Sequence, residues 1–180
     1  LGTAGVTVGL ALQGGLANLA GGVLLLLFKP FVVGDYIIQD QSNGCEGTVA
    51  KIEICYTTLL SIDNKKIVVP NGTLSNSTII NVTAKENRKL EIKVGISYEA
   101  DIQKAKRIIE KILREDADTK SDTKEMVVFV DELADSAVIM GLRVWVSTER
   151  YWPTKWRLNQ KIKEEFDANG IVIPYNQMEV

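Results

Sequence analysis

Histidine is absent from this 180-residue sequence, and cysteine occurs only twice. Because histidine is the commonest general base and metal ligand, its absence removes most acid–base and metal-dependent mechanisms. Cys45 and Cys55 lie ten residues apart without a CxxC pair, so a zinc site has no support and two reduced thiols are expected. The net charge of −2 argues against a nucleic-acid binder that depends on phosphate contacts.

Patterns that carry catalysis are also missing. Asp116, Asp118 and Asp122 have the spacing of calcium ligands, but Ser121 stands where an EF-hand requires glycine and Val127 where it requires glutamate. We therefore interpret the three aspartates as solvated loop charges. No nucleophile–base pair, metal cluster or phosphate-binding loop is visible, so we expect neither an enzyme nor a cofactor.

Charge is absent from the first 28 residues, and Lys29 carries the first ionisable side chain. One helix over residues 1–28 would be about 40 Å long, more than the hydrocarbon core of a bilayer requires. The glycine pair Gly14-Gly15 is the expected position of a bend. The sequence therefore predicts a membrane helix over residues 1–29 with a kink near Gly14.

Small residues recur in this helix, and we expect Gly2, Ala4, Gly5, Gly9 and Ala11 to lie at helix–helix contacts. A lipid-facing anchor or a glycine-rich core helix is the plainer interpretation of the GxxxG pattern at Gly5–Gly9. However, each glycine costs up to ~1 kcal/mol of helix propensity relative to alanine, and close packing of helices explains their number better. Seven such helices at ~8 Å spacing would leave a channel of roughly 4 Å radius, so a pore is possible without the subunit number being fixed.

Short segments rich in β-branched residues follow Lys29-Pro30, which ends the helix. They cover residues 32–38, 48–54, 57–62 and 66–69 and are separated by turn residues. This pattern predicts a compact, barrel-like β-domain over residues 30–82.

The pattern changes after residue 82. Strands are predicted at residues 90–96, 126–130, 138–146 and 171–173, and amphipathic helices at 101–115 and 154–168, the second ending at Asn169-Gly170. The order βαββαβ predicts a ferredoxin-like α/β domain over residues 83–180. Trp145, Trp152 and Trp156 are interpreted as core or subunit contacts rather than as platforms for stacking bases.

Several motifs, taken in order, resemble the small-conductance mechanosensitive channel (MscS) family. They are GLALQGGLANLAGGV at 9–23, FKPF at 28–31, GD at 34–35, VPNG at 69–72, IN at 80–81, RVW at 143–145, FDANGI at 166–171 and PYNQM at 174–178. The resemblance implies a membrane α + β protein with a pore helix, an Sm-like β-domain and a ferredoxin-like domain. It implies a homoheptamer in a bacterial or archaeal cell membrane, its β and α/β domains in the cytoplasm, that opens under membrane tension and releases ions and small solutes on hypo-osmotic shock.

Site residues follow from the same resemblance. Val6 and Leu10 match two apolar constriction rings, which expel water until the pore widens. The residues that match the hinge of the pore helix are Gln13, Gly14, Asn18 and Gly22. A second role for Asn18, a polar group satisfied by a neighbouring helix, is left open beside the hinge. Asn71 is a candidate for the lining of a lateral portal, although Pro70-Asn71-Gly72 is also an ordinary turn.

Two further expectations concern the extent and class of the protein. Members of the family carry two transmembrane helices before the pore helix, so we interpret the sequence as part of a longer chain. The rival interpretation is a soluble Sm-like ring that binds RNA. It would require a basic surface, and it leaves residues 1–28 without a purpose.

Overall fold

The computed structural model describes residues 2–40, 44–119 and 126–175, with side chains from residue 5 onward. The chain forms two compact units, Leu1–Ala84 and Lys85–Val180. Each unit has its own hydrophobic core.

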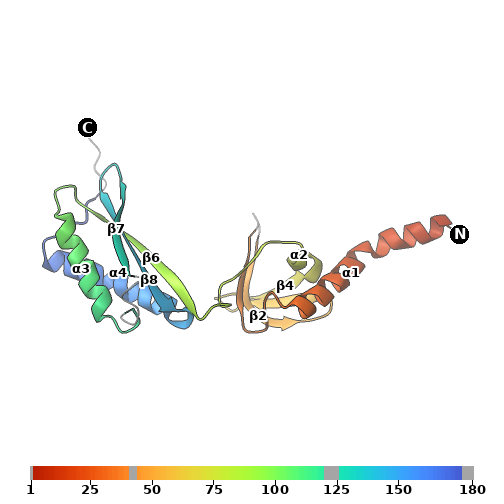
Figure 1. Ribbon diagram of the computed structural model, residues 1–180. Coiled ribbons are helices and arrows are strands. Elements are labelled where there is room, and N and C mark those ends of the chain that lie inside the picture. The colour runs from red at the N-terminus through yellow and green to blue at the C-terminus, as the bar shows by residue number, and fades with distance from the viewer. Residues whose placement is uncertain (1, 41–43, 120–125, 176–180) are drawn as a thin grey trace. The chain divides into compact units, whose positions relative to one another are not determined.

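The N-terminal unit begins with α1 (Gly2–Phe28), one α-helix that continues unbroken through Gly14 and Gly15, the pair at which the sequence predicts a bend. The helix ends where Lys29 adopts a left-handed conformation (φ 46°) and donates its N–H to the Leu25 carbonyl at 3.0 Å. Pro30 follows and cannot continue the helix. Figure 1 shows the C-terminal half of α1 beside α2 and its N-terminal half extending away from the β-sheet.

Five antiparallel strands form the sheet of this unit, in the order β4-β3-β2-β1-β5. They are β1 (Tyr36–Gln39), β2 (Glu46–Ile52), β3 (Tyr56–Leu60), β4 (Lys66–Pro70) and β5 (Ile79–Asn81), and α2 (Asn71–Ser75) lies between β4 and β5 in sequence. The predicted barrel-like form is not confirmed: the described strands do not close into a barrel, because β4 and β5 remain at opposite edges of the sheet. The three-residue β5 pairs with β1 alone, and α2 separates it from β4 in sequence.

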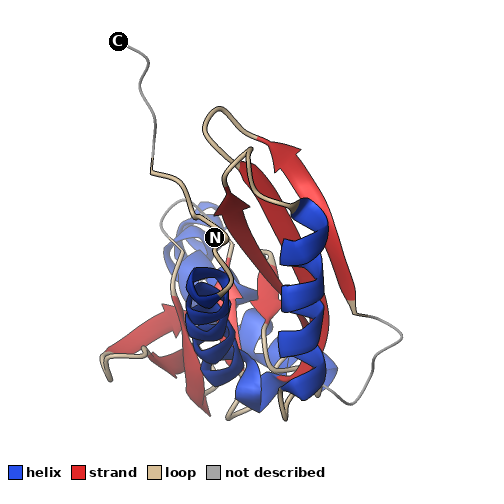
Figure 2. Ribbon diagram, turned by 90° about the vertical axis from the view of Figure 1, so that its left-hand side faces the viewer, coloured by secondary structure: helices blue, strands red, loops and turns tan. Residues whose placement is uncertain are grey.

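The C-terminal unit consists of a three-stranded sheet and two helices. Its elements are β6 (Asn87–Ile96), α3 (Ile102–Glu115), β7 (Val127–Leu133), β8 (Val138–Ser147), the short η1 (Thr148–Arg150) and α4 (Tyr151–Ala168), with strand order β6-β8-β7. Both helices pack on the same face of the sheet (Figure 2), where Ile109 of α3 and Leu158 of α4 join Leu142 of β8 in one core. Asp101 caps α3 by accepting the Lys104 N–H at 3.0 Å.

The predicted last strand at residues 171–173 is not formed. α4 ends at the predicted Asn169-Gly170, where Asn169 is the C-cap and Gly170 follows in the left-handed conformation (φ 71°). The Ile171 N–H bonds back to the Phe166 carbonyl at 2.9 Å. Beyond it, the Ser97 N–H donates to the Val172 carbonyl at 2.9 Å, but no ladder continues from this bond. Pro174 lacks an N–H, and Ile171 is buried in the core rather than aligned with a strand edge. Within the described residues the unit is therefore βαββα.

Candidate functional site: a helix in two halves

The N-terminal half of α1 has no packing partner in the described chain. Val6 and Leu10 are 64% and 67% exposed. A Cβ placed on Gly5, Gly9, Gly14 or Gly15 would meet no atom within 4 Å. Residues 5–28 form the one helix in the described part of the chain that is long and apolar enough to cross a membrane. An apolar surface of this length must be covered by lipid or by other helices.

Three of the predicted packing residues of this half are exposed in the structure. Gly5, Gly9 and Ala11 are exposed and therefore available to another chain. For Gly2 and Ala4 the structure describes the helical backbone alone. Val6 and Leu10 are one helical turn apart and face the same side of α1.

The C-terminal half of α1 is packed tightly against the β-domain. A Cβ on Gly21 would lie 2.6 Å from the Asn71 carbonyl oxygen. A Cβ on Gly22 would lie 1.9 Å from the Ile54 carbonyl oxygen and 2.7 Å from Asn71 Nδ2. Only glycine fits at these two positions, because side chains do not approach backbone atoms below about 3.0 Å. We call the contacting residues Ile54, Asn71 and Gly72 the α1 seat.

A polar contact fixes α1 on this seat. The Gly72 N–H donates to Asn18 Oδ1 at 3.1 Å. Gly72 is the second residue of α2, so its N–H has no acceptor within that helix, and Asn18 supplies one. Of the two roles left open for Asn18, the structure shows the polar partner.

Asn71 is the centre of the α1 seat. Its side chain has no exposed surface, and its Nδ2 donates to the Glu53 carbonyl at 2.7 Å. Its Oδ1 accepts the Thr57 hydroxyl, also at 2.7 Å. A side chain buried within its own chain contributes no surface to an aqueous portal, so the interpretation of Asn71 as a portal lining conflicts with this conformation.

The structure brings together only part of the predicted hinge set. Asn18 and Gly22 of this set lie at the α1 seat, together with Asn71, the predicted portal residue. Gln13 and Gly14 are exposed on the N-terminal half of α1, which we call its free half. Sequence reasoning missed Gly21, Gly72 and Thr57. The pair Gly21-Gly22 is compatible with a close backbone approach, but the pair Gly14-Gly15 has the same sequence and open space around it, so the sequence does not distinguish the two.

A second network holds the chain where it leaves α1. Asp35 Oδ2 accepts the Val32 N–H at 2.8 Å and Asn81 Nδ2 at 2.9 Å, and Oδ1 accepts the Thr83 hydroxyl at 3.0 Å. Burial alone raises the pKa of Asp35, but these hydrogen bonds outweigh it and hold the pKa below its ordinary value. Asn81 also donates to the Pro30 carbonyl at 3.2 Å, so the end of α1 is tied to β5.

The aspartates of the C-terminal unit are not simple solvated charges. Asp116 is 2% exposed and accepts two hydrogen bonds from Arg157, at 2.7 and 2.9 Å. Asp118 accepts Arg157 Nη2 at 2.7 Å and the Thr154 hydroxyl at 3.0 Å. The sequence interpretation is therefore wrong for these two residues, which join the end of α3 to α4. Asp122 lies outside the described residues.

Burial of Asp116 acts against its ionisation by raising its pKa. The Arg157 guanidinium and the Asp118 N–H outweigh this effect, so the pKa of Asp116 lies below its ordinary value. The Arg157 hydrogen bond is also the main cause that lowers the pKa of Asp118. Both carboxylates therefore remain ionised at neutral pH and serve as a structural clamp.

The tryptophans divide into two groups. Trp152 and Trp156 lie one turn apart on the exposed face of α4, with ring centroids 6.1 Å apart. Trp145 of β8 packs under the Lys89 ammonium at 4.9 Å, and its buried Nε1 has no hydrogen-bond partner among the described residues. The prediction of core or subunit contacts thus stays open for the two exposed rings.

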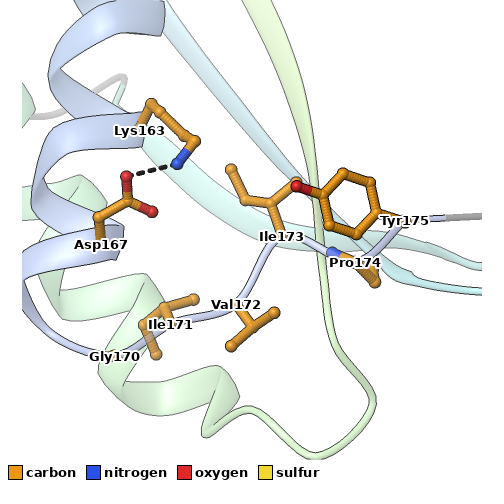
Figure 3. Close-up of a pocket in the computed structure, with 8 residues that line it drawn as sticks. All are labelled: Lys163, Asp167, Gly170, Ile171, Val172, Ile173, Pro174 and Tyr175. Carbon is orange, nitrogen blue, oxygen red and sulfur yellow. Dashed lines mark hydrogen bonds and ion pairs between the residues drawn. The ribbon is translucent and has the colours of Figure 1, made fainter.

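An open pocket of about 470 Å³ lies beyond α4 (Figure 3). Its wall includes the ion pair between Lys163 and Asp167, together with Ile173 and Tyr175. No group of three or more metal-binding side chains occurs in the parts of the chain that are described. The pocket belongs to the C-terminal unit, whereas the α1 seat belongs to the N-terminal unit.

Comparison with known proteins gives a consistent result along the whole chain. The family description "Mechanosensitive ion channel, beta-domain" matches residues 15–84, and "Mechanosensitive ion channel MscS, C-terminal" matches residues 90–173. The small-conductance mechanosensitive channel of Edwardsiella ictaluri is 41% identical over 177 residues, which cover 98% of this chain and 60% of that protein. An uncharacterised MscS family protein of Archaeoglobus fulgidus is 36% identical over 176 residues, which cover 98% and 61% of the two chains.

The solved structures agree with the sequence relatives. The crystal structure of Helicobacter pylori MscS in its closed state is 32% identical and superposes with a TM-score of 0.88, over 100% of this chain and 70% of that one. The chain spans about 60% of the length of the curated relatives quoted above. On this evidence the chain belongs to the MscS family of mechanosensitive ion channels.

Proposed function

We propose that this chain is the pore and cytoplasmic part of a homo-oligomeric channel that membrane tension opens, releasing ions and small solutes on hypo-osmotic shock. The observation that carries the proposal is the contrast between the two halves of α1. The first half is uncharged, rich in small residues and exposed on every side, while the second is packed against a folded domain. A helix with these properties is suited to pack against copies of itself around an axis, and the resemblance supports seven copies.

Hydrophobic gating follows from the side chains on the free half. Val6 and Leu10 lie on one face of α1, so each contributes one apolar ring if that face points to the axis. A ring of apolar side chains a few ångströms wide expels water, and ions then face a barrier without a physical plug. Because valine is shorter than leucine, the ring at Leu10 is the narrower barrier and the principal gate.

Opening requires the free half of α1 to move while the other half stays attached. The small residues Gly5, Gly9 and Ala11 would let neighbouring helices slide and tilt past one another. Membrane tension favours the state of larger area, so it shifts the population toward the tilted, open arrangement. The residues between Gln13 and Asn18 are where the free half meets the anchored half, and they would absorb the change of direction.

The orientation in the membrane follows from the first charge. Lys29 stands at the end of the apolar stretch, as expected for a helix that leaves the bilayer on the cytoplasmic side of a bacterial or archaeal membrane. The hydrogen-bond network of Asp35, Asn81 and Thr83 at the end of α1 would then lie at the membrane surface, next to lipid headgroups. Lipids and permeating solutes are the partners of this arrangement.

The test is Leu10→Ser in the full-length protein, recorded by patch clamp in liposomes under graded suction. A hydroxyl at the gate lets water remain in the ring, so the tension at half-opening should fall. Leu12→Ser is the matched control, because Leu12 is a similarly exposed leucine that points about 200° away around the helix. Leu12→Ser should not lower the threshold, and an unchanged threshold in Leu10→Ser would exclude Leu10 as the gate.

A further inference from the structure

Behind the α1 seat lies a buried hydrogen-bond network centred on Asn71. Asn71 is tied to the turn between β2 and β3 by two hydrogen bonds and to β3 itself by a third. Its N–H donates to the Cys55 carbonyl at 2.9 Å, its Nδ2 donates to the Glu53 carbonyl, and its Oδ1 accepts the Thr57 hydroxyl. The side-chain oxygen has Thr57 as its one donor among the described residues.

Thr57 has no exposed surface, and its hydroxyl donates to Asn71 from the beginning of β3. Its neighbour Thr58 is also buried, but no side-chain hydrogen bond is found for Thr58 in the described structure. The two threonines therefore share residue type, strand and burial, and differ in whether the hydroxyl reaches the α1 seat.

The α1 helix packs closely against the Asn71 amide and the Gly72 nitrogen. The position of a Cβ on Gly22 is already 2.7 Å from Asn71 Nδ2, and that of a Cβ on Gly21 is 2.7 Å from the Gly72 nitrogen. A rotation of the Asn71 amide would thus change the surface against which Gly22 packs. It would also disturb the Asn71–Gly72 peptide unit whose N–H reaches Asn18.

We infer that Thr57 is a positioning residue for the attachment of the pore helix: its hydroxyl holds the Asn71 amide, and through it the Gly72 N–H, in the orientation that binds Asn18. Valine has nearly the shape of threonine, so Thr57→Val removes the donor with little change in packing. The buried Oδ1 is then left unsatisfied, which is unfavourable enough to make other orientations of the amide competitive.

The first experiment measures how firmly α1 is attached to the α1 seat, and it does not depend on channel gating. Amide hydrogen exchange at Gly72 is measured in the full-length protein in lipid nanodiscs, because Asn18 is the acceptor of that N–H. Thr57→Val should speed this exchange about 3- to 10-fold, the factor that corresponds to one net hydrogen bond. Thr57→Ser and Thr58→Val should stay within about twofold of wild type.

A double-mutant cycle separates positioning from general destabilisation. In an Asn18→Ala background the Gly72 N–H has already lost its acceptor, so Thr57→Val should add little to its exchange. An equal acceleration in both backgrounds, or an equal effect of Thr58→Val, would overturn the inference. Should Thr57→Val not fold, Thr57→Ala compared with Thr58→Ala makes the same test.

The consequence for gating rests on the proposed function and is measured separately. Under graded suction, Thr57→Val should shift the tension at half-opening, and the shift should vanish in the Asn18→Ala background. If wild-type protein shows no tension-gated current while the exchange results hold, the proposed function fails and the role of Thr57 stands. If currents are normal and Thr57→Val leaves the Gly72 exchange unchanged, the role of Thr57 fails and the proposed function stands.

Discussion

Gly22→Ala is the substitution that tests the anchored half of α1 most severely. The new methyl group would lie 1.9 Å from the Ile54 carbonyl oxygen and 2.7 Å from Asn71 Nδ2. To reach even 3.0 Å from that oxygen, α1 or the β2–β3 turn must move by about 1.1 Å. The turn is held by the hydrogen bonds from Asn71 to Glu53 and Cys55, so α1 is the part that moves.

The size of the effect follows from two opposing contributions. Alanine gains up to ~1 kcal/mol of helix propensity over glycine. Overpacking against backbone that cannot relax costs about 1–3 kcal/mol. Set against the full gain of about 1 kcal/mol, the net result is a destabilisation of up to roughly 2 kcal/mol that falls on the contact between α1 and α2, with the fold of the β-domain retained.

Hydrogen exchange of α1 and of Gly72, together with the thermal midpoint of the full-length protein in detergent, measures this effect. Gly22→Ala should lower the midpoint by a few degrees and speed exchange at Gly72. Gly15→Ala is the matched control, since a Cβ there meets no atom within 4 Å and the substitution should leave Gly72 protected. Wild-type exchange at Gly72 in Gly22→Ala would refute the close approach of α1 to Ile54.

The C-terminal unit gives two more predictions. Asp116→Ala should destabilise that unit by about 3 kcal/mol in denaturant unfolding. This value is at the low end of the range for buried ion pairs, because the Arg157 side chain is 32% exposed to solvent. Because the pKa values of Asp116 and Asp118 are lowered by folding, their contribution is complete above the unfolded value of about 3.9 and is lost as pH falls through the folded values. Wild-type stability should thus decline below about pH 4, and a pH-independent difference between wild type and Asp116→Ala would contradict this. Asp101→Ala removes the cap of α3 and should cost about 0.5–2 kcal/mol, whereas an unchanged midpoint would show that the cap is dispensable.

The elements that could be predicted from the sequence are those set by local chemistry. The uncharged run predicted α1, the β-branched segments predicted β2 to β4, and the pattern Asn169-Gly170 predicted the end of α4. The open edges of the N-terminal sheet and the irregular conformation of residues 171–173 could not be predicted, because they depend on which strand edges meet in space. Residues 171–173 have strand composition, yet the one backbone hydrogen bond found between Val172 and this region of the described chain comes from Ser97, the residue after β6.

The functional residues show the same division. Val6 and Leu10 could be chosen from one apolar face of a helix, and their role at a gate is still a prediction. Asn71 looked like an ordinary turn or portal residue, because the residues around its side chain, among them Glu53 and Gly22, are distant from it in sequence. Asp116 looked solvated, since its partner Arg157 is 41 residues away in sequence.

The most direct test of the central claim is single-channel patch clamp of the full-length protein in liposomes, under graded suction and a salt gradient. Currents should appear above a threshold of tension and stop when the tension is released, with a reversal potential that reports the ion preference. Protein that is inserted and folded, yet remains electrically silent up to the tension at which the liposome ruptures, would show that the chain does not form a tension-gated channel.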